Sequence, residues 1–262
     1  MINDYLLNMQ HNPVLTPRFY FSAAGVNCAI ICQDQDFLNL LMKRYWCFET
    51  KNQPEYEFMV QIQPSILNYS GGSSRPALVV KRMGKGNNFV IKGPSYIALA
   101  NTNTRKVLVK MADTSGFDDF LHVIFALILA GKGGLVLDAL TVQQKEGVNI
   151  FVKTIDEPDL ANALTIGNPV VIRPRNSRFY IYSTPFHDEQ TEKPITDRVM
   201  LRALYLLKKD YRKGLDSLER AAAVSELVRC ASWFTDDPFL RNRISYTCTT
   251  VIDSVPAYKL NF

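Results

Sequence analysis

A succession of short apolar runs separated by polar turns, from Gly134 to Phe186, constrains the fold of this chain more than any other feature. Residues 135–142 and 148–153 are two such runs, and the turn around Glu146 lies between them. Runs of this length that flank a Lys-Glu-Gly turn predict a β-hairpin.

A brief helix and a second pair of strands are predicted after this hairpin. Asp156 and Glu157 suit the first turn of a helix, which we expect to end near Gly167. Residues 170–173 and 179–182 then indicate two strands around the polar turn at Arg175, Asn176 and Ser177. This order of elements predicts an α/β (mixed α+β) fold.

The motifs in this stretch resemble the HPr kinase-related family, whose core is a phosphate-loop fold shared with phosphoenolpyruvate carboxykinases. Residues 137–142 (LDALTV) stand where that family has a strand of the type L-H-A-S-x-V, and residues 183–186 (STPF) stand at its T-P-F segment. The closing residues 255–262 (VPAYKLNF) resemble its terminal V-P-x-Y-x-L-x-F strand. The resemblance implies a β-rich N-terminal region, 1–112, and an HPr kinase-like core with a mixed sheet and C-terminal helices, 113–262.

The same resemblance predicts a degenerate nucleotide site. Where the family has a glycine-rich loop followed by lysine and Ser or Thr, residues 153–159 read KTIDEPD. No glycine is present there to let backbone amides close around phosphate, and the carboxylates would repel a triphosphate. Asn168 and Pro169 stand where the family has two aspartates, and Asp138 replaces its histidine. The degenerate positions are Asp138, Lys153, Asp156, Glu157, Asp159, Asn168 and Pro169.

Three classes of function fit these residues. The one we favour is a non-catalytic kinase-like binding or scaffold subunit, with no cofactor and no metal, because the resemblance implies a protein partner or a homo-oligomer. The second is an enzyme with a rebuilt carboxylate or metal site, formed by Asp138 and the acids at 156–159, with His187 as a further ligand. The third is a nucleic-acid or anionic-polymer binder, which the modest net charge of +5 makes the least favoured.

Basic residues on two stretches of the chain are the candidates for a partner surface. One group lies on predicted strands in the N-terminal half, and the other lies around the second predicted hairpin of the core. The residues are Lys81, Arg82, Lys85, Lys92, Arg173, Arg175 and Arg178. Solvated strand faces are the favoured explanation for the first group, because charged edges discourage aggregation.

Composition and length limit the remaining possibilities. A chain of 262 residues with 47% hydrophobic residues can bury ample core in one large domain or two modest ones. The five cysteines are odd in number and lack CxxC spacing, which favours reduced thiols in a cytoplasmic protein. The start of the chain lacks the pattern of a targeting signal, and the most apolar run, 120–130, is too short for membrane insertion. We expect this run to form a buried helix in which His122 is hydrogen-bonded rather than catalytic.

Further elements are predicted from periodicity and capping signals in the N-terminal half. Ala24 and Gly25 join two strands, Asp34 or Asp36 caps a helix that ends at Arg44, and Thr114 or Ser115 caps a helix that ends at Gly131. Four short strands between these helices, separated by turns, predict an antiparallel meander over 77–82, 89–92, 96–100 and 106–111.

The C-terminal residues predict helices followed by a strand. Residues 199–209 are helical by propensity but a strand by the family pattern, so both alternatives stay open. A helix is predicted from Gly214 to Phe234, with Glu219 completing a capping box, and another from Asp237 and Pro238. Residues 257–262 alternate as a final strand.

Overall fold

A computed structural model describes residues 16–64, 78–84, 86–145, 147–153, 169–185, 198–208, 213–232, 234–235 and 237–261. They form a mixed α+β fold in two compact units, Met1–Leu121 and His122–Phe262. The boundary between the units falls inside helix α3 (Phe117–Gly131), shortly after the residue 112/113 division expected from the sequence. Across the described residues, no helix combines the length and apolar character needed to cross a membrane.

The first unit is built on a seven-stranded mixed sheet with the order β1-β2-β3-β7-β6-β5-β4. Its strands are β1 (Arg18–Ala23), β2 (Val26–Cys32), β3 (Tyr56–Ile62), β4 (Val79–Met83), β5 (Asn88–Lys92), β6 (Tyr96–Asn101) and β7 (Lys106–Met111). Strands β4 to β7 form the predicted antiparallel meander. Strand β3 pairs in parallel with both β2 and β7, which joins the meander to the β1–β2 hairpin.

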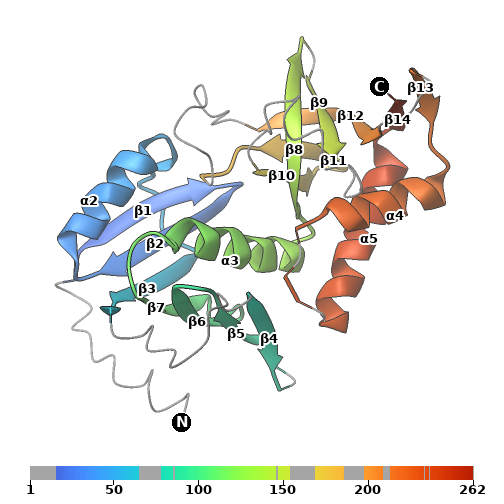
Figure 1. The fold of residues 1–262 in the computed structure, drawn as a ribbon. Coiled ribbons are helices and arrows are strands. Elements are labelled where there is room, and N and C mark those ends of the chain that lie inside the picture. Colours follow the sequence, from blue (N-terminus) through green and yellow to red (C-terminus); the bar gives the residue numbers. More distant parts are fainter. Residues whose placement is uncertain are drawn as a thin grey trace. The chain divides into compact units, whose positions relative to one another are not determined.

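Aromatic side chains fill the core of the first unit, on the face of the sheet that helices cover. Phe120 in α3 packs edge-on against Phe58 in β3, with ring centroids 6.1 Å apart, and against Tyr96 in β6 at 5.6 Å. Phe37 in α2 (Gln35–Arg44) packs against Phe117 at 5.1 Å. Figure 1 shows α2 beside β1 in this unit.

Local signals explain where the first elements begin and turn. The Asp34 side chain accepts a hydrogen bond from the Phe37 amide at 2.9 Å and caps α2 as expected, and a short 3-10 helix, η1 (Trp46–Phe48), follows α2. Ala24 and Gly25 both have positive φ, 51° and 70°, which confirms the tight turn between β1 and β2.

The second unit contains another seven-stranded mixed sheet, with the order β11-β10-β8-β9-β12-β14-β13. Its elements are β8 (Leu135–Gln144), β9 (Gly147–Lys153), β10 (Pro169–Arg175), β11 (Arg178–Tyr182), β12 (Val199–Lys208), β13 (Gly214–Ser217), α4 (Arg220–Cys230), α5 (Pro238–Ser254) and β14 (Ala257–Asn261). Both predicted hairpins are confirmed, as β8–β9 and β10–β11. Figure 1 shows α4 and α5 side by side in this unit.

The long strands β8 and β12 each pair with different strands along their length, which closes part of this sheet on itself. Residues 135–138 of β8 pair with β10, whereas residues 139–144 pair with β9. Strand β12 pairs with β11 at residues 199–200 and in parallel with β9 and β14 further along. Strands β11, β10, β8, β9 and β12 are therefore linked in a closed circuit, which brings the β10–β11 hairpin to the start of β12.

The structure differs from the sequence-based prediction at residues 214–217, and it shows which of two predicted structures residues 199–208 adopt. The helix expected from Gly214 to Phe234 is wrong in its first turns, because residues 214–217 form β13, which pairs with β14. Helix α4 starts only at Arg220, and Glu219 makes no side-chain capping bond. Residues 199–208 form strand β12 rather than a helix, because long-range pairing on two sides outweighs the helix propensity of its leucines.

Helix α5 starts where the sequence predicts. Asp237 accepts hydrogen bonds from the amides of Phe239 and Leu240, both at 3.1 Å, and Pro238 occupies the first turn. Arg220 in α4 and Asp253 in α5 form a two-pronged ion pair, at 2.6 and 2.9 Å, that joins the two helices.

Candidate functional site

The described part of the predicted nucleotide site gathers around the middle of β8. Asp138 lies directly opposite Pro169, the first residue of β10. On the other side of β8, Ala139 pairs with Val152, so Lys153 follows immediately after the last residue of β9 that pairs with β8. The chain thus leaves β9 and re-enters β10 next to the same residue, Asp138.

Hydrogen bonds hold the residues around Asp138 in the second unit. Thr184, which is 2% exposed, donates its hydroxyl to the carbonyl oxygen of Pro169 at 2.5 Å. The amide of Ser232 donates to the carbonyl oxygen of Val136 at 2.8 Å, and Leu137 forms an isolated bridge with Ala231. The residues after α4 therefore lie against the first half of β8, close to Asp138.

A half-buried thiol, Cys230, and a buried one, Cys248, lie near this part of β8. Burial raises the pKa of Cys230 to about 12, with further contributions from the charges of Glu226 and Asp138. Burial also raises the pKa of Cys248 to about 12, and Cys230 adds to that shift. Raised pKa values keep both thiols in the protonated form near neutral pH.

Several predicted site residues lie outside the described residues. Asp156, Glu157, Asp159 and Asn168 belong to this group, as do His187 and Lys85, and for Lys153 the backbone alone is described. Within the described ranges, no three side chains of the metal-ligating types come together in a cluster. The described residues of the site thus bring Asp138, Lys153 and Pro169 together by backbone register.

His122 has the hydrogen bond expected for a buried-helix histidine. Its Nε2 lies 3.2 Å from the Ser232 hydroxyl, and its ring packs edge-on against Phe234 with centroids 5.3 Å apart. Contacts of this kind fix the ring in place, which is a structural role.

The candidate partner-surface residues divide between the two units. Lys81 and Lys92 lie on one face of the β4–β5 pair, and Arg82 lies on the other face. Arg173, Arg175 and Arg178 lie on β10 and β11 in the second unit, on one face of that hairpin. The described members of the set therefore form two separate groups.

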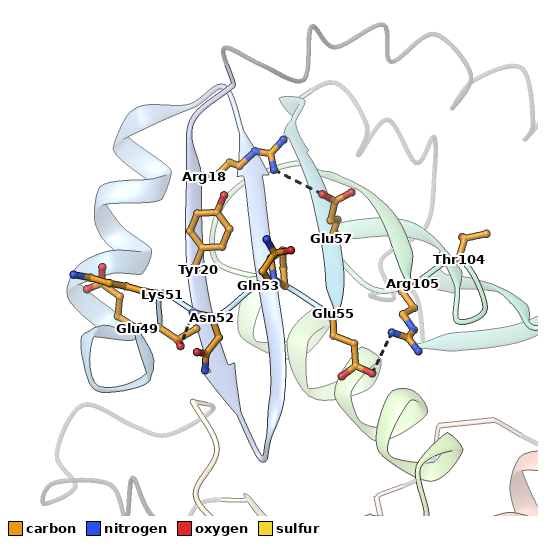
Figure 2. A pocket seen from close by; sticks show the side chains of 12 residues that line it. Arg18, Tyr20, Glu49, Lys51, Asn52, Gln53, Glu55, Glu57, Thr104 and Arg105 are labelled. Carbon is orange, nitrogen blue, oxygen red and sulfur yellow. Dashed lines mark hydrogen bonds and ion pairs between the residues drawn. The ribbon is translucent and has the colours of Figure 1, made fainter.

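The sequence did not indicate a polar pocket of about 670 Å³ in the first unit. Figure 2 shows Arg18 and Tyr20 from β1, Glu57 from β3 and Arg105 from the turn before β7 around it. Residues 49–55, which connect η1 to β3, complete the lining. No local motif marks such a pocket, because its residues meet only through the parallel pairing of β3.

The charges in this pocket are balanced. Arg18 lies 3.7 Å from Glu57, and Arg105 lies 3.7 Å from Glu55. Altogether the pocket is lined by three basic and three acidic side chains. Such a lining suits a ligand that carries both hydrogen-bond donors and acceptors better than it suits a polyphosphate.

A scan against protein-family models finds no matching family, and a search of curated proteins finds no match.

Proposed function

We propose that this chain is a non-catalytic, HPr kinase-like binding or scaffold subunit that acts through protein–protein contacts. The proposal is supported by the resemblance of residues 137–142, 183–186 and 255–262 to motifs of that family. The mixed sheet of the second unit, with β9, β12 and β14 in parallel, is compatible with such a core.

One observation carries the proposal. Strand β9 ends at Lys153, beside Asp138, and the residues that follow it are Thr-Ile-Asp-Glu-Pro-Asp. In a phosphate-loop enzyme, the segment at this place supplies glycine amides, a lysine and a hydroxyl to the nucleotide and its magnesium ion. Here the residues after β9 include three carboxylates but no glycine and no lysine, so the segment lacks the glycine amides and the lysine that bind phosphate.

The carboxylates should weaken nucleotide binding by more than the absence of phosphate-binding groups alone would, because they repel the phosphates. A triphosphate is strongly anionic, and Asp138 adds a further carboxylate next to the end of β9. Like charges at contact distance repel, and they disfavour binding by more when water is excluded from between them. The residues present therefore do not fit a nucleotide with its magnesium ion, and we derive no phosphoryl-transfer step for this chain.

Phosphoryl-transfer assays on the full chain test the proposal. We expect no release of labelled phosphate from γ-labelled ATP above the buffer rate, and no labelling of the protein, with magnesium or manganese present. ATP turnover that disappears in Asp138→Asn would contradict the proposal and would favour a rebuilt carboxylate site. The Asp216→Asn variant is a matched control for the lost charge, because Asp216 lies in β13 at the opposite edge of the sheet.

A further inference from the structure

Arginines gather on one face of the three neighbouring strands β10, β11 and β12. Arg173 lies opposite Tyr180, and Tyr180 lies opposite Met200. Arg175 lies opposite Arg178 on the same face of the hairpin, because both are two residues further along from the first pair. We define the arginine face as Arg173, Arg175, Arg178, Arg198 and Arg202 with Tyr180, Tyr182 and Met200.

Side-chain contacts bring the arginines from separate strands together. The Arg198 guanidinium lies over the Tyr180 ring, 5.7 Å from its centroid. Nη1 of Arg178 lies 3.7 Å from the sulfur of Met200. Each contact joins β11 to β12 or to the residue before it, which the sequence alone does not indicate.

Four arginines of the face are exposed, and the described residues of its strands carry no acidic side chain. Arg175, Arg178, Arg198 and Arg202 are all exposed, and the described residues 169–185 and 198–208 include no Asp or Glu. Among the residues that the structure describes, no carboxylate forms an ion pair with Arg175, Arg178 or Arg198. Like charges opposite each other, as in the Arg175–Arg178 pair, cost a hairpin about 0.2–1 kcal/mol.

A pocket of about 480 Å³ adjoins these arginines. It is lined by Arg178, Met200 and Arg202, together with Ser177 and the residues 254–256 that follow α5. The planar guanidinium of Arg178 presents a fork of donors at this pocket, and one such fork can bind one carboxylate through two hydrogen bonds.

We propose that the arginine face docks a carboxylate-rich, extended segment of a partner protein. The inference rests on the proposed function, since it names the surface and the partner chemistry of the same binding subunit. Alternate side chains of an extended acidic segment are spaced by about 6.8 Å, as are the arginines along one strand. Bidentate arginine contacts and neighbouring tyrosines are typical of the residues that dominate protein interfaces.

A nucleic acid fits this face less well. The ring of Tyr180, the aromatic side chain at the centre of the face, already packs against Arg198, so this ring face does not accept a base. The face also spans only three strands, a width of about 10 Å, whereas nucleic-acid affinity grows with the number of phosphates neutralised along a basic track. A net charge of +5 for the whole chain supplies no such track.

Fluorescence anisotropy with a labelled peptide of alternating glutamate and serine tests this inference. We expect the full chain to bind this peptide and to ignore the same peptide with glutamine in place of glutamate. Arg178→Glu should weaken binding by about tenfold or more, because it removes a donor and adds a repelling charge. The same variant should not lower the melting temperature, because it places opposite charges across the hairpin at Arg175. A loss of binding in this variant therefore does not come from unfolding.

Charge-matched variants locate the binding surface. The double variant Arg175→Glu and Arg198→Glu should abolish binding, whereas Lys81→Glu with Lys92→Glu, which changes the net charge by the same amount in the first unit, should change it by less than about twofold. No binding of the acidic peptide, equal loss in both double variants, or tighter binding of a labelled oligothymidylate of equal charge would each overturn the inference.

The result also separates this inference from the proposed function. A chain that neither hydrolyses ATP nor binds the acidic peptide keeps its proposed function and loses this docking surface. A chain that binds the peptide through the arginine face and also transfers phosphate keeps the surface and loses the proposed function.

Discussion

Asp138 in β8 lies directly opposite Pro169 in β10, although 30 positions of sequence separate them. Because β9 ends beside the same part of β8, the described residues Lys153 and Pro169, which flank segment 154–168 in the sequence, both lie next to Asp138 by backbone register. This relationship links the sequence-based interpretation to the fold, since the acids at 156, 157 and 159 belong to that segment.

The Thr184 hydroxyl bonds the carbonyl oxygen of Pro169, opposite Asp138, so removing it should lower the stability of the chain. We expect Thr184→Val to lower the free energy of unfolding by about 1–3 kcal/mol, because it leaves the Pro169 carbonyl oxygen without this buried donor. Denaturant unfolding measures the change. Thr250→Val is a matched control, because the Thr250 hydroxyl bonds a carbonyl on the exposed side of α5 where water can replace it. Equal effects in the two variants would contradict this account of Thr184.

Gly147 should tolerate no side chain. Its φ is +152°, and an added Cβ would lie 2.5 Å from Cγ of Arg202 and 2.6 Å from the carbonyl oxygen of Met200. We expect Gly147→Ala to destabilise the chain by about 1–3 kcal/mol, since the backbone of β12 would have to move. Gly214→Ala has open space around it and should stay within about 0.5 kcal/mol. Thermal unfolding of both variants distinguishes this clash from a general effect of losing glycine.

Tyr45 connects α2 to the start of α3 in the first unit. Its hydroxyl donates to the Asp118 carboxylate, which also pairs with Arg44. Burial and the Asp118 charge raise the pKa of Tyr45, so the phenol stays a donor. We expect Tyr45→Phe to cost about 1–3 kcal/mol of unfolding free energy. Tyr246→Phe, at a residue that is 74% exposed, should leave the denaturation midpoint unchanged.

The raised pKa values of Cys230 and Cys248 should make the folded chain less stable in alkali. The pKa values of Cys230 and Cys248 are raised from 9.0 to about 12 in the folded chain. Because the thiols are protonated more strongly in the folded chain, their contribution to the unfolding free energy is fully present below pH 9. It is lost as the pH rises through the folded-state pKa values. The unfolding free energy should therefore fall between pH 9 and 12, by up to about 1.4 kcal/mol per pH unit for each thiol.

Replacing the thiols isolates their share of this pH dependence. The Cys230→Ala and Cys248→Ala double variant keeps the tyrosines and lysines that also titrate in alkali. Its unfolding free energy should fall less steeply than that of the unmodified chain over the same window. Parallel slopes for the two proteins would show that the thiols do not carry the effect.

Local signals in the sequence were enough to predict most elements of the fold. The Asp34 and Asp237 caps, the Ala24-Gly25 turn and the two hairpins of the second unit all act over a few residues, and each is confirmed. The helix predicted from Gly214 failed because β13 forms through pairing with the distant β14, which no local pattern reveals.

Long-range pairing also explains which site features the sequence missed. The pocket around Arg18 and Glu57 needs β3 to pair with β2 and β7, and the arginine face needs Arg198 to reach Tyr180 from another strand. Arg173, Arg175 and Arg178 are candidates for a partner surface from the sequence, because their basic side chains flank a locally formed hairpin. The polar residues of the pocket carry no motif, so composition alone could not bring them together.

Isothermal titration of the full chain with ATP and magnesium tests the central claim most directly. We expect no saturable heat up to millimolar nucleotide, because the residues after β9 include carboxylates where phosphate would need amide and lysine donors. A saturable isotherm with a Kd of about 1 mM or below, competed by ADP, would contradict it.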